Sequence, residues 1–227
     1  ESGLYAGMIL LLAPMKMPYR AEPERRITSP MDDLKEGFQY IIASQEMLRL
    51  MLINFVRTGV FMPLVLFLPA YTEEALRSGA GVSTSMVVVM GAGGLTATVM
   101  ISSFGFFARK GLVTLVTLVS GSSVILILGL SQWIWLSVPI MLFMGFSQTN
   151  FIVSNQTLIQ TLVPDNLRGR VTSVWHYEQG LIPMFAAITG GVGIVVGIDT
   201  AMAIGGAIAL AVSLFFLIRF DNIRQLE

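Results

Sequence analysis

Residues 112–131 read LVTLVTLVSGSSVILILGLS, a stretch of twenty residues without a charged side chain. A run of about 20 apolar residues is the length that an α-helix needs to cross a bilayer core of roughly 30 Å. Lipid offers no hydrogen-bonding partner to peptide groups, so a helix, which satisfies them internally, is the expected structure. The stretch therefore predicts a membrane-spanning helix.

Similar stretches recur along most of the chain. Of its 227 residues, 54% are hydrophobic and only 12% are charged, whereas soluble domains carry about 25% charged residues. Residues 49–220 therefore predict an all-α, polytopic membrane bundle of six transmembrane helices. The expected spans are 50–70, 86–107, 112–131, 134–162, 174–197 and 201–220.

The remaining segments flank this bundle. Residues 4–13 are apolar but too few to cross a membrane, so we interpret residues 1–14 as the tail of a truncated transmembrane helix. A frayed, tag-like end is the alternative. Residues 15–48 are expected to form a cytoplasmic linker, and residues 221–227 a cytoplasmic tail.

Within the linker, residues 29–45 predict an amphipathic helix. Ser29 is a plausible N-cap with Pro30 at the first helical position. Two interpretations stay open: a helix lying along the membrane surface, or a connector that covers the spans. The apolar residues that fall on one face at helical spacing are Met31, Leu34, Phe38, Ile41 and Ile42.

The distribution of basic residues predicts the orientation, because short cytoplasmic loops are enriched in lysine and arginine. Arg57 lies inside a span, and Arg77 is the one basic residue on one side of the membrane. The opposite side, and with it the C-terminus, is therefore expected to be cytoplasmic. Its basic residues are Lys16, Arg20, Arg25, Arg26, Lys35, Arg49, Arg109, Lys110, Arg168, Arg170, Arg219 and Arg224.

Other features argue against several classes of function. The net charge is zero, which gives no reason to expect a nucleic acid partner. The chain has no cysteine and one histidine, so we expect no metal site. It contains no phosphate loop, metal-ligand pair or nucleophile elbow. We therefore expect neither an enzyme nor a cofactor.

Three segments resemble major facilitator superfamily transporters, in particular the branch of enterobactin-type exporters and related drug efflux proteins. Residues 162–171, LVPDNLRGRV, preceded by Asn155, Gln156 and Gln160, resemble the segment between helices ten and eleven. Residues 33–40, DLKEGFQY, resemble the amphipathic helix after the central loop. Residues 105–111, GFFARKG, resemble the short basic loop between helices eight and nine, without its acidic residue.

This resemblance implies two six-helix halves around a cavity that opens alternately to each side. The chain would supply the C-terminal half, and its partners would be the missing N-terminal half, the lipid bilayer, a small-molecule substrate and protons. The implied location is the bacterial cytoplasmic (inner) membrane. The residues implied for cytoplasmic gating loops are Gly105, Arg109, Lys110, Asp165, Arg168, Gly169 and Arg170.

Two ionisable residues lie inside predicted spans, where each costs at least ~2.5 kcal/mol on insertion scales. Arg57 and Glu178 each lie eight residues beyond a boundary arginine, a depth of about 12 Å. Asn54 is one turn from Arg57, and Asn155 and Gln156 enter the same layer. We expect this layer either to face the cavity, where Glu178 exchanges a proton, or to be a fixed ion pair that locks the helices. A third interpretation is that Glu178 lies close enough to the interface to reach water by snorkelling.

The fourth span is unusually polar. Gln148, Asn155 and Gln156 fall within one broad face of the predicted helix. A cavity wall is one interpretation. Hydrogen bonding between helices, worth about 0.6 kcal/mol per pair, is the other.

The leading functional hypothesis is proton-coupled export of amphipathic small molecules, such as drugs or siderophores, by alternating access. Transport of lysolipid or of another solute by the same fold is a second hypothesis. A non-transporting membrane scaffold is a third. The scaffold predicts that Asn155 never becomes accessible to water, whereas either transporter predicts that it does.

Overall fold

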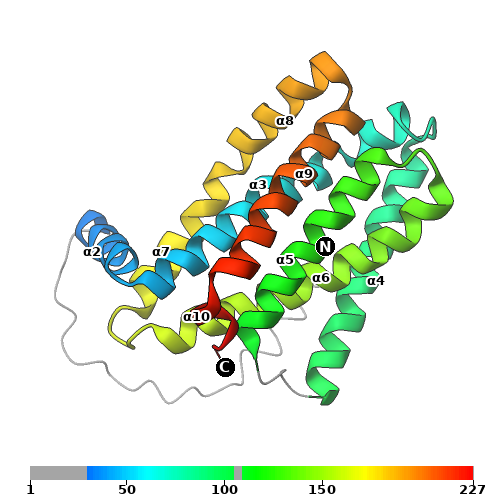
Figure 1. Cartoon of the computed structure of the whole chain (residues 1–227). Coiled ribbons are helices and arrows are strands. Elements are labelled where there is room, and N and C mark those ends of the chain that lie inside the picture. The colour runs from blue at the N-terminus through cyan, green and yellow to red at the C-terminus, as the bar shows by residue number, and fades with distance from the viewer. Residues whose placement is uncertain (1–29, 105–108, 227) are drawn as a thin grey trace, which may run out of the picture. The chain divides into compact units, whose positions relative to one another are not determined.

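The computed structural model describes residues 30–104 and 109–226 (Figure 1). Within these ranges the chain forms helices and no strand. Six helical stretches are long and apolar enough to cross a membrane. The predicted all-α membrane bundle is therefore confirmed. The expected truncated helix at 1–14 and the first part of the linker lie outside the described residues.

The helices follow one another with short connections, and Figure 1 shows the long ones running up and down side by side. The spanning stretches are α3, α4, α5, α6, the combined segment α7–η1–α8, and α9. In order, the elements are α2 (Pro30–Ala43), α3 (Gln45–Glu74), α4 (Ala80–Phe104), α5 (Lys110–Leu130), α6 (Ile134–Leu162), α7 (Arg168–Tyr177), η1 (Glu178–Leu181), α8 (Ile182–Val196), α9 (Ile198–Arg219) and α10 (Asp221–Arg224).

The fifth span differs from the single helix expected over 174–197. It begins at Arg168, tightens into the 3₁₀ turn η1, and resumes as α8. Pro183 lies in the first turn of α8 and has no N–H to donate to the carbonyl of residue 179. The missing hydrogen bond gives a physical reason for the break at this point.

A single residue separates the amphipathic helix α2 from the spanning helix α3. Ser44 has an extended backbone, and its hydroxyl accepts a hydrogen bond from the Met47 N–H at 3.4 Å. A serine N-cap satisfies one of the first N–H groups of a helix. This cap therefore starts α3 at Gln45, five residues earlier than the predicted span.

Close contacts between helices depend on glycines. A Cβ placed on Gly93 of α4 would overlap the carbonyl oxygen of Leu142 in α6. In return, a Cβ on Gly145 of α6 would overlap the carbonyl oxygen of Met90 in α4. Small residues let membrane helices approach to backbone contact. The α4–α6 pair is therefore held by reciprocal glycine contacts.

Residues 221–227, expected as a tail, include the short helix α10, which folds back onto the start of α5. Ile223 is completely buried, and the Gly111 N–H donates to the Leu226 carbonyl oxygen at 3.1 Å. The C-terminal segment thus closes the end of the bundle to which α2 and α7 also belong (Figure 1).

At the opposite end, one tyrosine joins three helices. Tyr71 of α3 is completely buried. Its hydroxyl lies 2.8 Å from the carbonyl oxygen of Leu128, 3.0 Å from that of Ser131, and 3.3 Å from the Ser137 hydroxyl. The last carbonyls of a helix lack partners within it. Tyr71 therefore both caps α5 and fixes α3 against α5 and α6.

Candidate functional site

Arg57 lies in the middle of α3 and is only 4% exposed. Its Nε donates to Asn54 Oδ1 at 3.1 Å, and its Nη2 donates to Thr58 Oγ1 at 3.3 Å. Its Cζ lies 5.6 Å from the centre of the Phe151 ring of α6, within the range of a cation–π interaction. The guanidinium is thus held by its own helix and by one aromatic ring.

Asn54 connects this arginine to the carboxylate of Glu178. Asn54 Nδ2 donates to Glu178 Oε2 at 2.5 Å, while Asn54 Oδ1 accepts from Arg57. An amide has one accepting and one donating end, so the two bonds define its orientation. Among the ion pairs of the described residues, none joins Arg57 directly to Glu178. The two charges are therefore linked through an amide.

Local helix geometry explains why these groups meet. Asn54, Arg57 and Thr58 are spaced by three and four residues, so they share one face of α3. Glu178 begins the 3₁₀ turn in the broken helix opposite. Phe185 of α8 is expected to keep the two helices close, because its ring occupies the space where Gly59 lacks a side chain.

Helix α6 contributes the other predicted polar residues. Asn155 is 1% exposed, and neither atom of its amide has a hydrogen-bond partner in the described chain. Gln148 is half-buried and its Oε1 likewise lacks a partner there. Gln156 is half-buried. The structure thus joins Asn54, Arg57 and Glu178 by hydrogen bonds. Within the described part of the chain, no side-chain hydrogen bond links these three residues of α6 to that cluster.

Buried polar atoms almost always have a hydrogen-bond partner, and six here have none within the described chain. Three are donors: Arg57 Nη1, Asn155 Nδ2 and Trp175 Nε1. Three are acceptors: Gln148 Oε1, Asn155 Oδ1 and Glu178 Oε1. They belong to α3, α6 and the broken helix. Such a set can bind water or the polar part of a ligand.

Sequence reasoning did not assign three residues to the polar layer: Thr58, Phe151 and Trp175. Their spacing was a usable signal, since Thr58 and Asn54 are four residues apart, as are Phe151 and Asn155. Trp175 precedes Glu178 by three residues. Residues three or four apart share a helix face. Each of these three residues therefore lies next to a residue that had been predicted for the polar layer.

Those residues expected in gating loops that the structure describes lie at the end of the bundle that carries α2. Arg109 precedes α5 and is exposed, and Lys110 is the first residue of α5. Gly105 lies outside the described residues. Asp165 forms an ion pair with Arg168 at 2.7 Å, between two exposed side chains.

Part of the second expected loop is helical instead. Arg168, Gly169 and Arg170 form the first turn of α7. Pro164 precedes this turn, and residues 165–170 contain no further proline that would prevent helix formation. Arg170 forms an ion pair of 2.7 Å with Glu36 of α2, which connects two segments far apart in the sequence.

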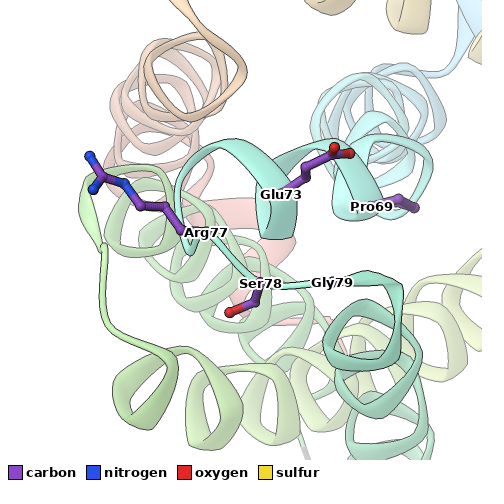
Figure 2. Close-up of a pocket in the computed structure, with 5 residues that line it drawn as sticks. All are labelled: Pro69, Glu73, Arg77, Ser78 and Gly79. Atoms are coloured by element: carbon purple, nitrogen blue, oxygen red, sulfur yellow. The ribbon is translucent and has the colours of Figure 1, made fainter.

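Two surface hollows lie away from Arg57 and Glu178. One is at the opposite end of the bundle, lined by Pro69, Glu73, Arg77, Ser78 and Gly79, and Figure 2 shows Glu73 and Arg77 pointing away from each other. These two charged side chains are exposed. The other is lined by residues of α3, α5, α8 and α9, without a charged group. Neither hollow includes a residue of the Arg57–Asn54–Glu178 cluster.

The helical bundle with a charged cluster between spanning helices is the architecture of a polytopic membrane protein. This chain belongs to the Major Facilitator Superfamily, whose family model matches residues 2–177. A superfamily of membrane transporters thus accounts for the fold.

Among solved structures, the chain is similar to a bacterial homologue of the human lysosomal transporter Spinster, in an inward-facing and unoccupied conformation. The identity is 16% and the TM-score 0.45, over 99% of this chain and 56% of that chain. The chain therefore spans just over half the length of that protein. No curated protein matches the chain.

Proposed function

We propose that this chain forms one half of a secondary transporter, in which the Arg57–Asn54–Glu178 cluster couples proton binding to substrate movement. The observation that carries the proposal is the amide bridge between the buried Arg57 and the half-buried Glu178. Ionisable groups within spans are costly and mark ion or substrate pathways by default. Two unsatisfied buried polar atoms of the cluster itself, Arg57 Nη1 and Glu178 Oε1, support a role in binding rather than packing alone.

The bridge suggests how a proton changes the contact between α3 and the broken helix. An ionised Glu178 accepts a charge-assisted hydrogen bond from Asn54, and such bonds are roughly twice as strong as neutral ones. Protonation removes the negative charge and weakens this bond. The helix that carries Glu178 is then freer to move relative to α3, which alternating access requires.

The proposal extends to substrate and orientation. A second six-helix half completes the cavity, and the transported molecules are amphipathic, such as drugs or siderophores, moved out of the cell in exchange for protons. The basic end, with Arg109, Lys110, Arg168 and Arg170, faces the cytoplasm of a bacterium, in keeping with the positive-inside rule.

Replacing Glu178 by glutamine is expected to abolish the pH dependence of transport while leaving substrate binding measurable. Glutamine keeps the size and an accepting oxygen for Asn54, but it does not release a proton. The measurement is drug efflux from proteoliposomes containing the complete transporter, with and without an inward proton gradient. Transport driven as well by the gradient in the variant as in the wild type would contradict the coupling role.

His176 supplies the matched control. It is a titratable residue of the same helix, two residues before Glu178, and it is exposed. Its ring contacts Trp175 at 4.9 Å between centroids and forms no hydrogen bond with the cluster among those of the described residues. We expect His176→Gln to transport with an unchanged dependence on the gradient.

Labelling at position 155 separates a transporter from a scaffold. Asn155 is 1% exposed, and this chain contains no cysteine, so Asn155→Cys introduces a single thiol once every cysteine of the other half is replaced by serine. A transporter is expected to expose it in another state, and a membrane-impermeant maleimide should then react faster when substrate is added. A thiol that never reacts with or without substrate, but reacts after denaturation, would favour the scaffold.

A further inference from the structure

Asn155 of α6 carries a buried amide whose two ends are both unpaired. The side chain is 1% exposed, and neither its Oδ1 nor its Nδ2 has a hydrogen-bond partner within the described chain. A buried polar group without a partner costs free energy, because it has lost its hydrogen bonds to water. Since the amide is enclosed, neither lipid nor the other half of a transporter reaches it in this conformation. A partner in another conformation would offset the cost.

The Arg57–Asn54–Glu178 cluster has the complementary pair of unpaired atoms. Asn54 accepts from Arg57 Nε and donates to Glu178 Oε2. Two buried atoms of the charged groups remain without a partner among the described residues: Arg57 Nη1, a donor, and Glu178 Oε1, an acceptor. An asparagine amide offers one accepting and one donating end. The Asn155 amide can therefore repeat the bridge of Asn54 on the second atom of each charged group.

Asn155 also lies at the level of the guanidinium. The Phe151 ring is centred 5.6 Å from Arg57 Cζ, and Asn155 follows Phe151 by four residues on the same face of α6. The Nε of Arg57 donates to Asn54, three residues earlier in α3. Since α3 and α6 run in opposite directions, the guanidinium and Asn155 both lie on the same side of Phe151, toward the end of the bundle that carries α2.

The contacts of α6 with α4 leave the segment around Asn155 able to shift. The glycine contact that joins α6 to the backbone of α4 lies at Gly145, ten residues before Asn155. Shifts of packed helices by up to one turn, about 5.4 Å, occur in switching proteins. The half of α6 that contains Asn155 can therefore move relative to α3 while the half at Gly145 stays in contact with α4.

We propose that Asn155 forms a second amide bridge, between Arg57 Nη1 and Glu178 Oε1, in the alternative conformation of the transport cycle. Both bonds of this bridge involve a charged group, and such bonds are roughly twice as strong as neutral ones. Asn155 is then a positioning residue, because it acts through the two charged residues and couples the position of α6 to their charges. The inference rests on the proposed transport function, since it gives the cluster a second state.

Spin labels at positions 161 and 173 measure the distance between the ends of α6 and α7, where both native side chains are exposed. Thr161→Cys and Ser173→Cys are labelled in the complete transporter after every cysteine of the other half is replaced by serine. Double electron–electron resonance is expected to show two distances when substrate is present. We expect Asn155→Leu to lower the population of one of them about tenfold, because charge-assisted hydrogen bonds are lost. Asn155→Gln keeps both ends of the amide and is expected to retain both distances.

Asn150 supplies the matched control, because it is a second buried asparagine of α6. It is 3% exposed, and its Nδ2 donates to the Phe146 carbonyl oxygen at 2.9 Å. Asn150→Leu is expected to retain both distances and to lower the midpoint of thermal unfolding in detergent. Asn155→Leu is expected to leave that midpoint unchanged or to raise it, because leucine replaces an amide that has no partner in this conformation.

Three results would overturn the inference. Distances with unchanged populations in Asn155→Leu would show that the amide serves packing or holds a trapped water. An Asn155→Leu variant that unfolds earlier or does not fold would show that the amide has a partner in this conformation. A single distance in the protein with Asn155 intact, with or without substrate, would show that α6 does not move.

Failure of the proposed transport function gives a different result. In that case Glu178→Gln keeps its dependence on the proton gradient, while Asn155→Leu still changes the distances. Labelling of Asn155→Cys stays informative about accessibility, because the reaction with maleimide is irreversible and accumulates even when the alternative conformation is rarely populated.

Discussion

Replacing Arg57 by methionine is expected to abolish transport and to lower the free energy of unfolding by about 2 kcal/mol. Methionine keeps a similar length but provides no donor to Asn54 Oδ1, which accepts from Arg57 Nε. The Glu178 carboxylate then lacks a compensating buried cation. Because Glu178 is only half-buried, solvent screens part of its uncompensated charge, and the main cost is the loss of the charged donor to the buried Asn54. Chemical denaturation in detergent measures the loss of stability.

A double variant distinguishes the loss of charge balance from the loss of packing. In Arg57→Met with Glu178→Gln, neither charge is left alone, and Asn54 can still donate to the glutamine oxygen. We expect the double variant to recover most of the lost stability, but to remain inactive in proton-driven transport. A double variant as unstable as Arg57→Met alone would show that the arginine acts by filling space against Phe151.

Thr58→Val is a milder comparison within the same cluster. It removes the oxygen that accepts from Arg57 Nη2 at 3.3 Å and leaves the bridge through Asn54 in place. A typical hydrogen bond contributes about 1 kcal/mol, so the loss of stability should be clearly smaller than for Arg57→Met. Equal losses would argue that the bridge through Asn54 has no special importance.

The sequence predicted the features that depend on local composition. The charge-free stretch at 112–131 corresponds to α5, Lys110–Leu130, because a helix is the form in which apolar residues cross lipid. Counting helical rise from the boundary arginines brought Arg57 and Glu178 to one level, and the structure links them through Asn54. Depth along an axis is calculable from residue number alone.

Features that depend on contacts between helices were not predictable in this way. The bridging role of Asn54 requires the rotation of α3 relative to the broken helix, and residue spacing does not contain that angle. The ion pair between Glu36 and Arg170 joins segments more than one hundred residues apart. The 3₁₀ turn that begins at Glu178 was not predicted either. Pro183 indicates that the helix is interrupted nearby, but it does not show whether the interruption lies before or after the proline.

The second large effect is expected at the contact between α4 and α6, where Gly145→Ala should lower the free energy of unfolding by about 2 kcal/mol. Alanine favours a helix over glycine by about 1 kcal/mol, so helix propensity alone predicts the opposite sign. At Gly145, however, the new Cβ would overlap the carbonyl oxygen of Met90. That neighbour is backbone and has no rotamer to change, so the two helices must separate.

Gly205→Ala is the matched control, because Gly205 lies within α9 and a Cβ there meets nothing within 4 Å. We expect the stability of this variant to be unchanged or higher, since only the greater helix propensity of alanine acts at this position. Denaturation of both variants in detergent measures whether each substitution raises or lowers the free energy of unfolding. If Gly145→Ala were as stable as Gly205→Ala, backbone contact between α4 and α6 would not hold the bundle together. If both were destabilised, glycine would be needed for flexibility rather than for close approach.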